Sequence, residues 1–144
     1  MSYLNENLID RTLEEIENDY WKNISFPTGL VEKVFLIRKK KLKDLLQEDL
    51  RLMLSQKMGL NYAVPLAIDV LKNNLMTDAG IYEGDILESL LKIPSEFWKN
   101  GNGKQLAIDL KNMVESQYEK ISLAEISEEI KNGIVKTYVD FKNH

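Results

Sequence analysis

The chain has 144 residues, of which 44% are hydrophobic and 29% charged, and its net charge is −4. These values are typical of a globular protein with one core, and they exclude a disordered or fibrous chain. The lack of cysteine excludes disulfides and thiolate chemistry, and the acidic balance disfavours binding to a phosphate backbone. No apolar run approaches the roughly 20 residues of a transmembrane helix, so we expect a cytoplasmic protein without membrane contact.

Capping patterns predict the first two helices. Thr12 stands three residues before Glu15, as in a capping box, and residues 24–29 interrupt the helix that follows. Thr28 is a candidate cap for a second helix, which ends in the basic run 38–41. We interpret these cations as solvated charges that complement a helix C-terminus, with a site for an anionic ligand as the alternative.

An amphipathic helix and then an almost wholly apolar helix follow. The apolar face of the first helix is formed by Leu46, Leu50, Met53 and Leu54. Its polar face, on the opposite side, is formed by Glu48, Asp49, Arg51 and Lys57. Gly59 is predicted to end it as a left-handed cap. Residues 61–74 are predicted to form a buried helix rather than a strand, with Pro65 tolerated in its first turn.

The second half of the chain continues the helical pattern. A loop over 73–85 precedes a helix started by Gly84 or Asp85, and residues 100–103 form a clear break. Two long helices are expected after it, packed antiparallel, with Ser122 and Glu125 as a second capping box between them. The sequence therefore predicts an all-α fold, a single-domain compact bundle of about seven or eight helices over residues 1–144.

Catalytic and metal-binding patterns are missing from the sequence. The only histidine is the last residue, His144, so a serine–histidine relay would rest on a chain end. Asp78, Glu83 and Asp85 lack the spacing of a calcium loop, and no phosphate-binding glycine loop is present. We expect no catalytic residue, no cofactor and no metal, although a small hydrolase with two carboxylates stays an alternative.

Five segments together resemble one protein family. They are "LEEIENDYW", "FPTGLV", "IRKKKLKDLLQEDLRLMLSQKMGLNYAVPLA", "YEGDIL" and "EFW", which lie in this order between residues 13 and 98. The family comprises immunity proteins of bacterial contact-dependent growth inhibition systems. Lys41 and Glu83 depart from it, because family members often carry proline there, and the helices of residues 103–144 show no resemblance.

The resemblance implies a cytoplasmic, non-enzymatic helical protein that binds the C-terminal toxin domain of a cognate secreted effector. We expect that toxin to be a nuclease, whose cationic surface an acidic inhibitor covers. Tyr82, Glu83, Asp85 and Glu88 are the candidate toxin-binding residues, because they combine negative charge with an aromatic ring. The alternative is that Asp85 caps a helix, Tyr82 packs, and the interface lies on the C-terminal helices.

Other functional classes stay open at the level of sequence. A regulatory or adaptor protein would bind nucleic acid through the basic residues of 38–43, with a steep dependence on salt. A self-associating helical scaffold is a further possibility, since the sequence does not fix the oligomeric state. The immunity role expects a toxin domain as partner and no direct contact with nucleic acid.

Overall fold

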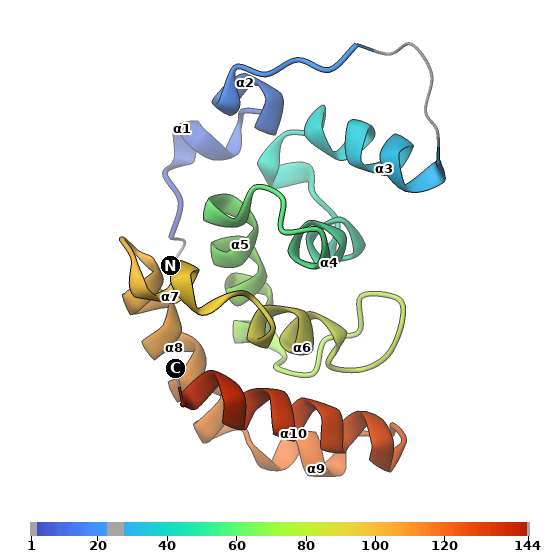
Figure 1. Ribbon diagram of the computed structural model, residues 1–144, viewed down its shortest axis with the longest axis vertical. Helices are drawn as coiled ribbons and strands as arrows, with labels where there is room; N and C mark the ends of the chain where they lie inside the picture. The colour runs from blue at the N-terminus through green and yellow to red at the C-terminus, as the bar shows by residue number, and fades with distance from the viewer. Residues whose placement is uncertain (1–2, 23–27, 144) are drawn as a thin grey trace.

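The computed structural model describes residues 3–22 and 28–143, and these form an all-α protein (Figure 1). The α-helices of this part of the chain are α1 (Glu6–Ile9), α2 (Leu13–Glu17), α3 (Gly29–Arg38), α4 (Gln47–Ser55), α5 (Leu60–Asn73), α6 (Asp85–Leu91), α7 (Ser95–Lys99), α8 (Gly103–Ser116), α9 (Glu119–Leu123) and α10 (Glu128–Lys142). A 3-10 turn, η1 (Leu42–Asp44), joins α3 to α4. The all-α class is confirmed, but the predicted seven or eight helices were too few, because short connecting segments also form helical turns.

The core is centred on α6, which packs against α4 and α5 on one side and α10 on the other (Figure 1). Ile86, Leu87 and Leu90 of this helix are completely buried. A single hydrophobic cluster runs from Leu13 in α2 to Tyr138 in α10. Because apolar burial is the main favourable term in folding, this short helix joins the two halves of the molecule.

The predicted caps of α2 and α3 are confirmed. The Thr12 hydroxyl accepts a hydrogen bond from the backbone N–H of Glu15, and the Glu15 carboxylate accepts one from the N–H of Thr12. The Thr28 hydroxyl accepts from the N–H of Val31 at the start of α3. The predicted interruption over 24–29 lies mostly outside the described residues.

The structure corrects two predictions around α4 and α5. Gly59 does adopt a left-handed conformation, with φ of 59°, but it is the N-cap of α5, and α4 has already ended at Ser55. Pro65 lies in the second turn of α5 rather than the first, and it is buried. The helix tolerates the lost backbone donor there because its apolar face is buried on α4 and α6.

The C-terminal helices also differ from the prediction. Ser127, not Ser122, caps the last helix, and its hydroxyl accepts from the N–H of Ile130. Ser122 lies within α9, beside Leu123, which is 75% exposed. The expected antiparallel pair of α8 and α10 is not the main contact of the last helix. α10 packs chiefly on α6 and meets α8 at an angle, where Tyr138 and Lys142 contact Glu115 (Figure 1).

The turn between α7 and α8 depends on a close approach of backbone to backbone. A Cβ added to Gly103 would lie 2.0 Å from the carbonyl oxygen of Phe97. Because this oxygen belongs to the backbone, a side-chain rotation cannot remove the clash. A Cβ at Gly29, in the first turn of α3, would meet nothing within 4 Å.

We therefore expect Gly103→Ala to lower the free energy of unfolding by at least about 2 kcal/mol, through displacement of α7 from α8. The matched substitution Gly29→Ala should be neutral or stabilising by up to about 1 kcal/mol, because alanine has the better helix propensity. Urea denaturation of both variants tests this. Equal stability of the two would contradict the close approach.

Candidate partner-binding surface

A tight loop over residues 77–84 leads into α6. Of the predicted partner-binding residues, Tyr82 and Glu83 lie in this loop, and Asp85 and Glu88 lie in the first turn of α6. An isolated antiparallel bridge pairs Asp78 with Glu83, so the loop closes on itself. Gly80 and Gly84 supply the positive φ angles of 117° and 90° that this closure requires. The loop is thus held in one shape before any partner binds, which lowers the entropy cost of association.

Asp85, the first residue of α6, holds the loop from inside. Its side chain is only 2% exposed, and its carboxylate accepts hydrogen bonds from the backbone N–H groups of Ala79 at 2.9 Å and Ile81 at 3.1 Å. Among the predicted residues, Asp85 therefore has no surface to offer a partner. It positions the loop that a partner would touch.

Arg51 of α4 lies on the other side of this carboxylate. Its Nε is 3.8 Å from Asp85 Oδ2, and this nitrogen is buried without a hydrogen bond. The prediction that Arg51 faces away from the core was wrong, because the guanidinium balances a buried negative charge. The ion pair ties the loop to α4 as well as to α6.

Tyr82 and Glu88 form a pair on the surface of α6. The Tyr82 hydroxyl donates a hydrogen bond to Glu88 Oε1, and Lys92 Nζ lies 3.9 Å from the same carboxylate oxygen. Partial burial, and then the hydrogen bond to Glu88, raise the pKa of the Tyr82 phenol above its ordinary value. The phenol therefore stays a hydrogen-bond donor across the physiological pH range, and Glu88 is already occupied by it.

The exposed part of the loop includes one residue that sequence reasoning missed. Ile81 is 61% exposed, next to the half-buried Tyr82 and Glu83. An exposed apolar side chain on a loop of fixed shape can be buried by a partner at a low entropy cost. Its signal in the sequence was an isoleucine between Gly80 and Glu83, outside any helical spacing.

The basic run after α3 is neither fully solvated nor free for an anion. Among the described residues, all its cations except Lys41 form ion pairs with neighbouring segments: Arg38 with Glu17 at 2.6 Å, Lys39 with Glu14 at 2.9 Å, Lys40 with Asp49 at 2.8 Å and Lys43 with Asp10 at 2.6 Å. These pairs attach α2 and α4 to the end of α3, and α1 to η1. The interpretation as solvated cations is thus corrected for Arg38 above all, since its side chain is only 4% exposed.

Arg38 makes the densest set of these contacts. Its guanidinium also donates to the backbone carbonyl of Asp19 at 2.6 Å and lies 4.9 Å from the centre of the Trp21 ring. The planar fork of arginine suits this arrangement, which a lysine could not reproduce. Arg38 is therefore a structural residue of the α2–α3 contact.

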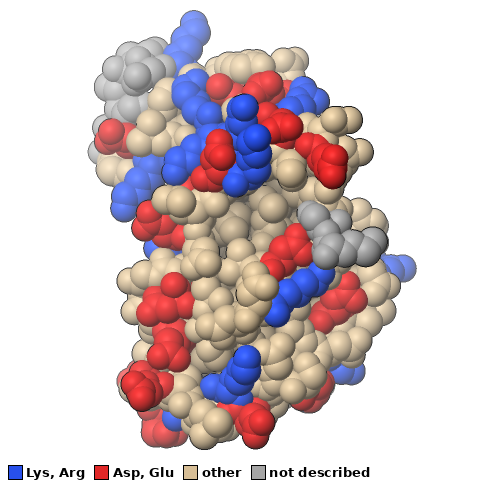
Figure 2. Space-filling model, turned by 180° about the vertical axis from the view of Figure 1, so that it is seen from behind, with Lys and Arg blue, Asp and Glu red and all other residues tan. Residues whose placement is uncertain are grey.

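The surface view agrees with this pattern of neutralised charge. Figure 2 shows blue and red side chains interleaved over the upper part of the molecule, and mainly red ones along the lower left edge. A band of uncharged surface crosses between them. No continuous cationic field of the kind that tracks a phosphate backbone is visible on this face.

The described part of the chain shows neither a metal-binding cluster nor a membrane-spanning helix. No three His, Cys, Asp or Glu side chains there converge so as to hold a metal ion. None of the described helices combines the length and the apolar content that crossing a bilayer requires.

The comparisons with known proteins give one match. The sequence model of a family described as CDI immunity proteins, where CDI stands for contact-dependent growth inhibition, matches residues 15–108. This segment contains α3 to α7, the loop 77–84 and the start of α8. No curated protein and no solved structure matches the chain.

The role of Asp85 is testable by removing its carboxylate. In Asp85→Ala the N–H groups of Ala79 and Ile81 lose their acceptor, so we expect the unfolding free energy to fall by about 1–3 kcal/mol. Hydrogen exchange at these two amides should also become at least tenfold faster. Glu83→Ala is the control, and a variant at Asp85 with wild-type exchange would contradict the assignment.

The structural role of the basic run is testable at Arg38. We expect Arg38→Met to lower the unfolding free energy by about 2–3 kcal/mol, because charge-assisted hydrogen bonds from a buried group are lost. Lys41 is exposed, and its side chain has no ion pair among the described residues, so Lys41→Met should change stability by less than about 0.5 kcal/mol. Urea denaturation distinguishes them, and equal effects would show that Arg38 is not a structural cation.

Proposed function

Because the chain belongs to the family of CDI immunity proteins, we propose that it binds and neutralises the C-terminal toxin domain of a cognate growth-inhibition effector. The match over residues 15–108 is the observation that carries this proposal. The proposed mechanism is occlusion in the cytoplasm: the protein covers the active or substrate-binding surface of the toxin and catalyses nothing itself. The proposed toxin activity is that of a nuclease.

Charge supports a nuclease as the target. An enzyme that cuts nucleic acid needs a cationic surface to hold phosphates, and this chain carries a net charge of −4. Opposite charges on two proteins raise the rate at which they meet and select their relative orientation. The inhibitor would thus compete with the substrate for the same cationic surface.

The loop 77–84 is the proposed contact on the inhibitor. Ile81 provides an exposed apolar side chain, and Asp78 and Glu83 flank it with carboxylates. Tyr82 adds a partly exposed ring whose hydroxyl is held by Glu88. Asp85 takes part by fixing the loop rather than by touching the toxin, so the four predicted residues fall into contacting and positioning roles.

The alternative function, nucleic-acid binding through residues 38–43, gains no support from the structure. Binding to a phosphate backbone would require these cations to leave the carboxylates that they pair with. Those pairs lie between separate helices, so their loss would also weaken the fold. Protein binding is therefore the proposed class.

Co-expression with the toxin domain tests the function. We expect the wild-type chain to restore growth and to co-purify with the toxin domain as a one-to-one complex. We expect the double variant Ile81→Ala/Glu83→Lys to raise Kd at least tenfold, or about 1.4 kcal/mol, because it removes the apolar anchor and reverses a charge. Titration calorimetry on the purified proteins measures this change.

Glu32→Lys is the matched control, because Glu32 is an exposed carboxylate in the first turn of α3, away from the loop. It should leave Kd within about threefold of wild type. A toxin domain that still kills the cell and never co-purifies would refute the immunity role. Normal affinity of the loop variant would refute only the choice of surface.

A further inference from the structure

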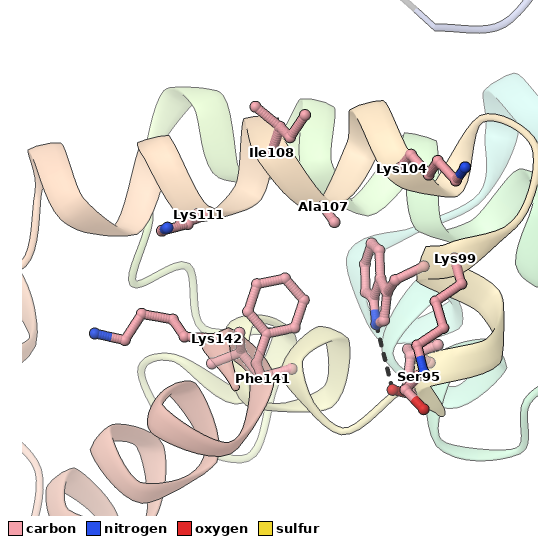
Figure 3. A pocket seen from close by; sticks show the side chains of 11 residues that line it. Ser95, Lys99, Lys104, Ala107, Ile108, Lys111, Phe141 and Lys142 are labelled. Atoms are coloured by element: carbon pink, nitrogen blue, oxygen red, sulfur yellow. Dashed lines mark hydrogen bonds between the residues drawn. The ribbon is translucent and has the colours of Figure 1, made fainter. Parts of the chain in front are cut away.

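A second surface lies at the opposite end of α6 from the loop, between α7, α8 and α10 (Figure 3). It is a groove of about 320 Å³. Phe141 of α10 points into it from below and Ala107 of α8 from above, while the Trp98 ring, whose Nε1 donates to the carbonyl of Ile93, closes one side. Ile108 extends the apolar surface over the outer side of α8 and is 52% exposed.

Lysines stand at both ends of this groove. Lys99 and Lys104 mark one end, and Lys111 and Lys142 mark the other (Figure 3). Lys104 and Lys111 are seven residues apart on α8, which places them about 10 Å apart along its axis. An apolar floor with a pair of cations at each end is therefore matched to a ligand with an apolar centre and two separated negative charges.

These lysines differ from those of the basic run. Within the described residues Lys99, Lys104 and Lys111 have no ion pair or hydrogen bond, whereas Lys142 lies 3.8 Å from Glu115. Exposed ammonium groups around one groove repel one another weakly through solvent, and a carboxylate placed between them would replace that repulsion with attraction. In a chain with a net charge of −4, such a local cationic cluster favours a partner that supplies carboxylates.

The groove is continuous with the side of α6 that the loop occupies. A shallow trough between α6 and α10 is lined at one end by Glu88, which binds Tyr82. It shares Leu91, Ile93, Ser95 and Phe141 with the groove. One partner segment can thus run from the loop along α10 to the lysines. This path covers the length of α6, about 10 Å, and then the length of the groove. This fits a protein segment better than a small molecule.

We propose that this groove is a second contact for the toxin domain, and that it takes an apolar side chain flanked by carboxylates about 10 Å apart. An α-helix with acidic residues at positions i and i+7 and an apolar residue between them has this geometry. The proposal rests on the immunity function, because that function supplies the protein partner. The toxin then presents cations to the loop 77–84 and carboxylates to the groove.

The test is charge reversal at the groove with the purified C-terminal toxin domain as probe. We expect Lys104→Glu/Lys111→Glu to raise Kd for the toxin at least tenfold and to weaken growth protection. The control Lys22→Glu/Lys33→Glu makes the same change of charge on exposed lysines near α2 and α3, and it should leave Kd within about threefold. Thermal unfolding of both variants should match the wild type, since all four side chains are exposed.

The outcomes separate the two proposals. Wild-type affinity in the groove variant, with binding by the wild-type chain intact, overturns the groove and leaves the immunity function standing. A wild-type chain that does not bind the toxin overturns both. Sedimentation of the free chain adds a third result: self-association that the groove variant abolishes, at unchanged toxin affinity, would assign the groove to a second copy of this chain and overturn the proposal.

Discussion

The burial of α6 is the constraint on which the other features depend. This helix has seven residues, too few to be stable alone, and it exists because α4, α5 and α10 enclose it. Its first residue, Asp85, organises the loop 77–84, and one of its last buried residues, Leu91, lines the groove. Both candidate surfaces are therefore set by one small element, and a change in its packing would alter them together.

Ion pairs play different parts in the two halves of the molecule. In the N-terminal half Arg38, Lys39, Lys40 and Lys43 form ion pairs that join separate helical segments. In the C-terminal half the lysines around Phe141 are mostly left to the solvent. The cationic cluster that is most conspicuous in the sequence thus maintains the fold, while the inconspicuous one is available to a partner.

Sequence reasoning succeeded where the determinant is local. Thr12 and Thr28 cap helices because the bonded groups lie three residues away, and the helix predicted to start at Gly84 or Asp85 does begin at Asp85, with Gly84 as its N-cap. Leu46 was placed in the core by helical spacing, but it is exposed because it precedes the first turn of α4 and lies outside its helical periodicity. Helical spacing therefore predicts burial only within the helix itself.

Sequence reasoning failed where the determinant joins distant segments. Arg38 reaches Glu17 across 21 residues, and no spacing rule connects them. Asp85 was predicted to bind the toxin, with helix capping as the alternative, but its burial depends on Arg51 and on the closure of the loop, which are products of the tertiary fold. The same is true of the groove, whose lysines come from three helices that are separate in sequence. Local patterns thus locate the elements, and only their packing shows which charges are free.

The placement of opposite charges at the two ends of α6 has a consequence for discrimination between toxins. A partner that docks on both surfaces must carry its own charges in the reverse order, so rotation by half a turn would oppose like charges at each end. A foreign toxin whose charges complement only one of the two surfaces is attracted at that surface and repelled at the other. Exchanging the residues of a single end would therefore not convert this inhibitor to a new specificity.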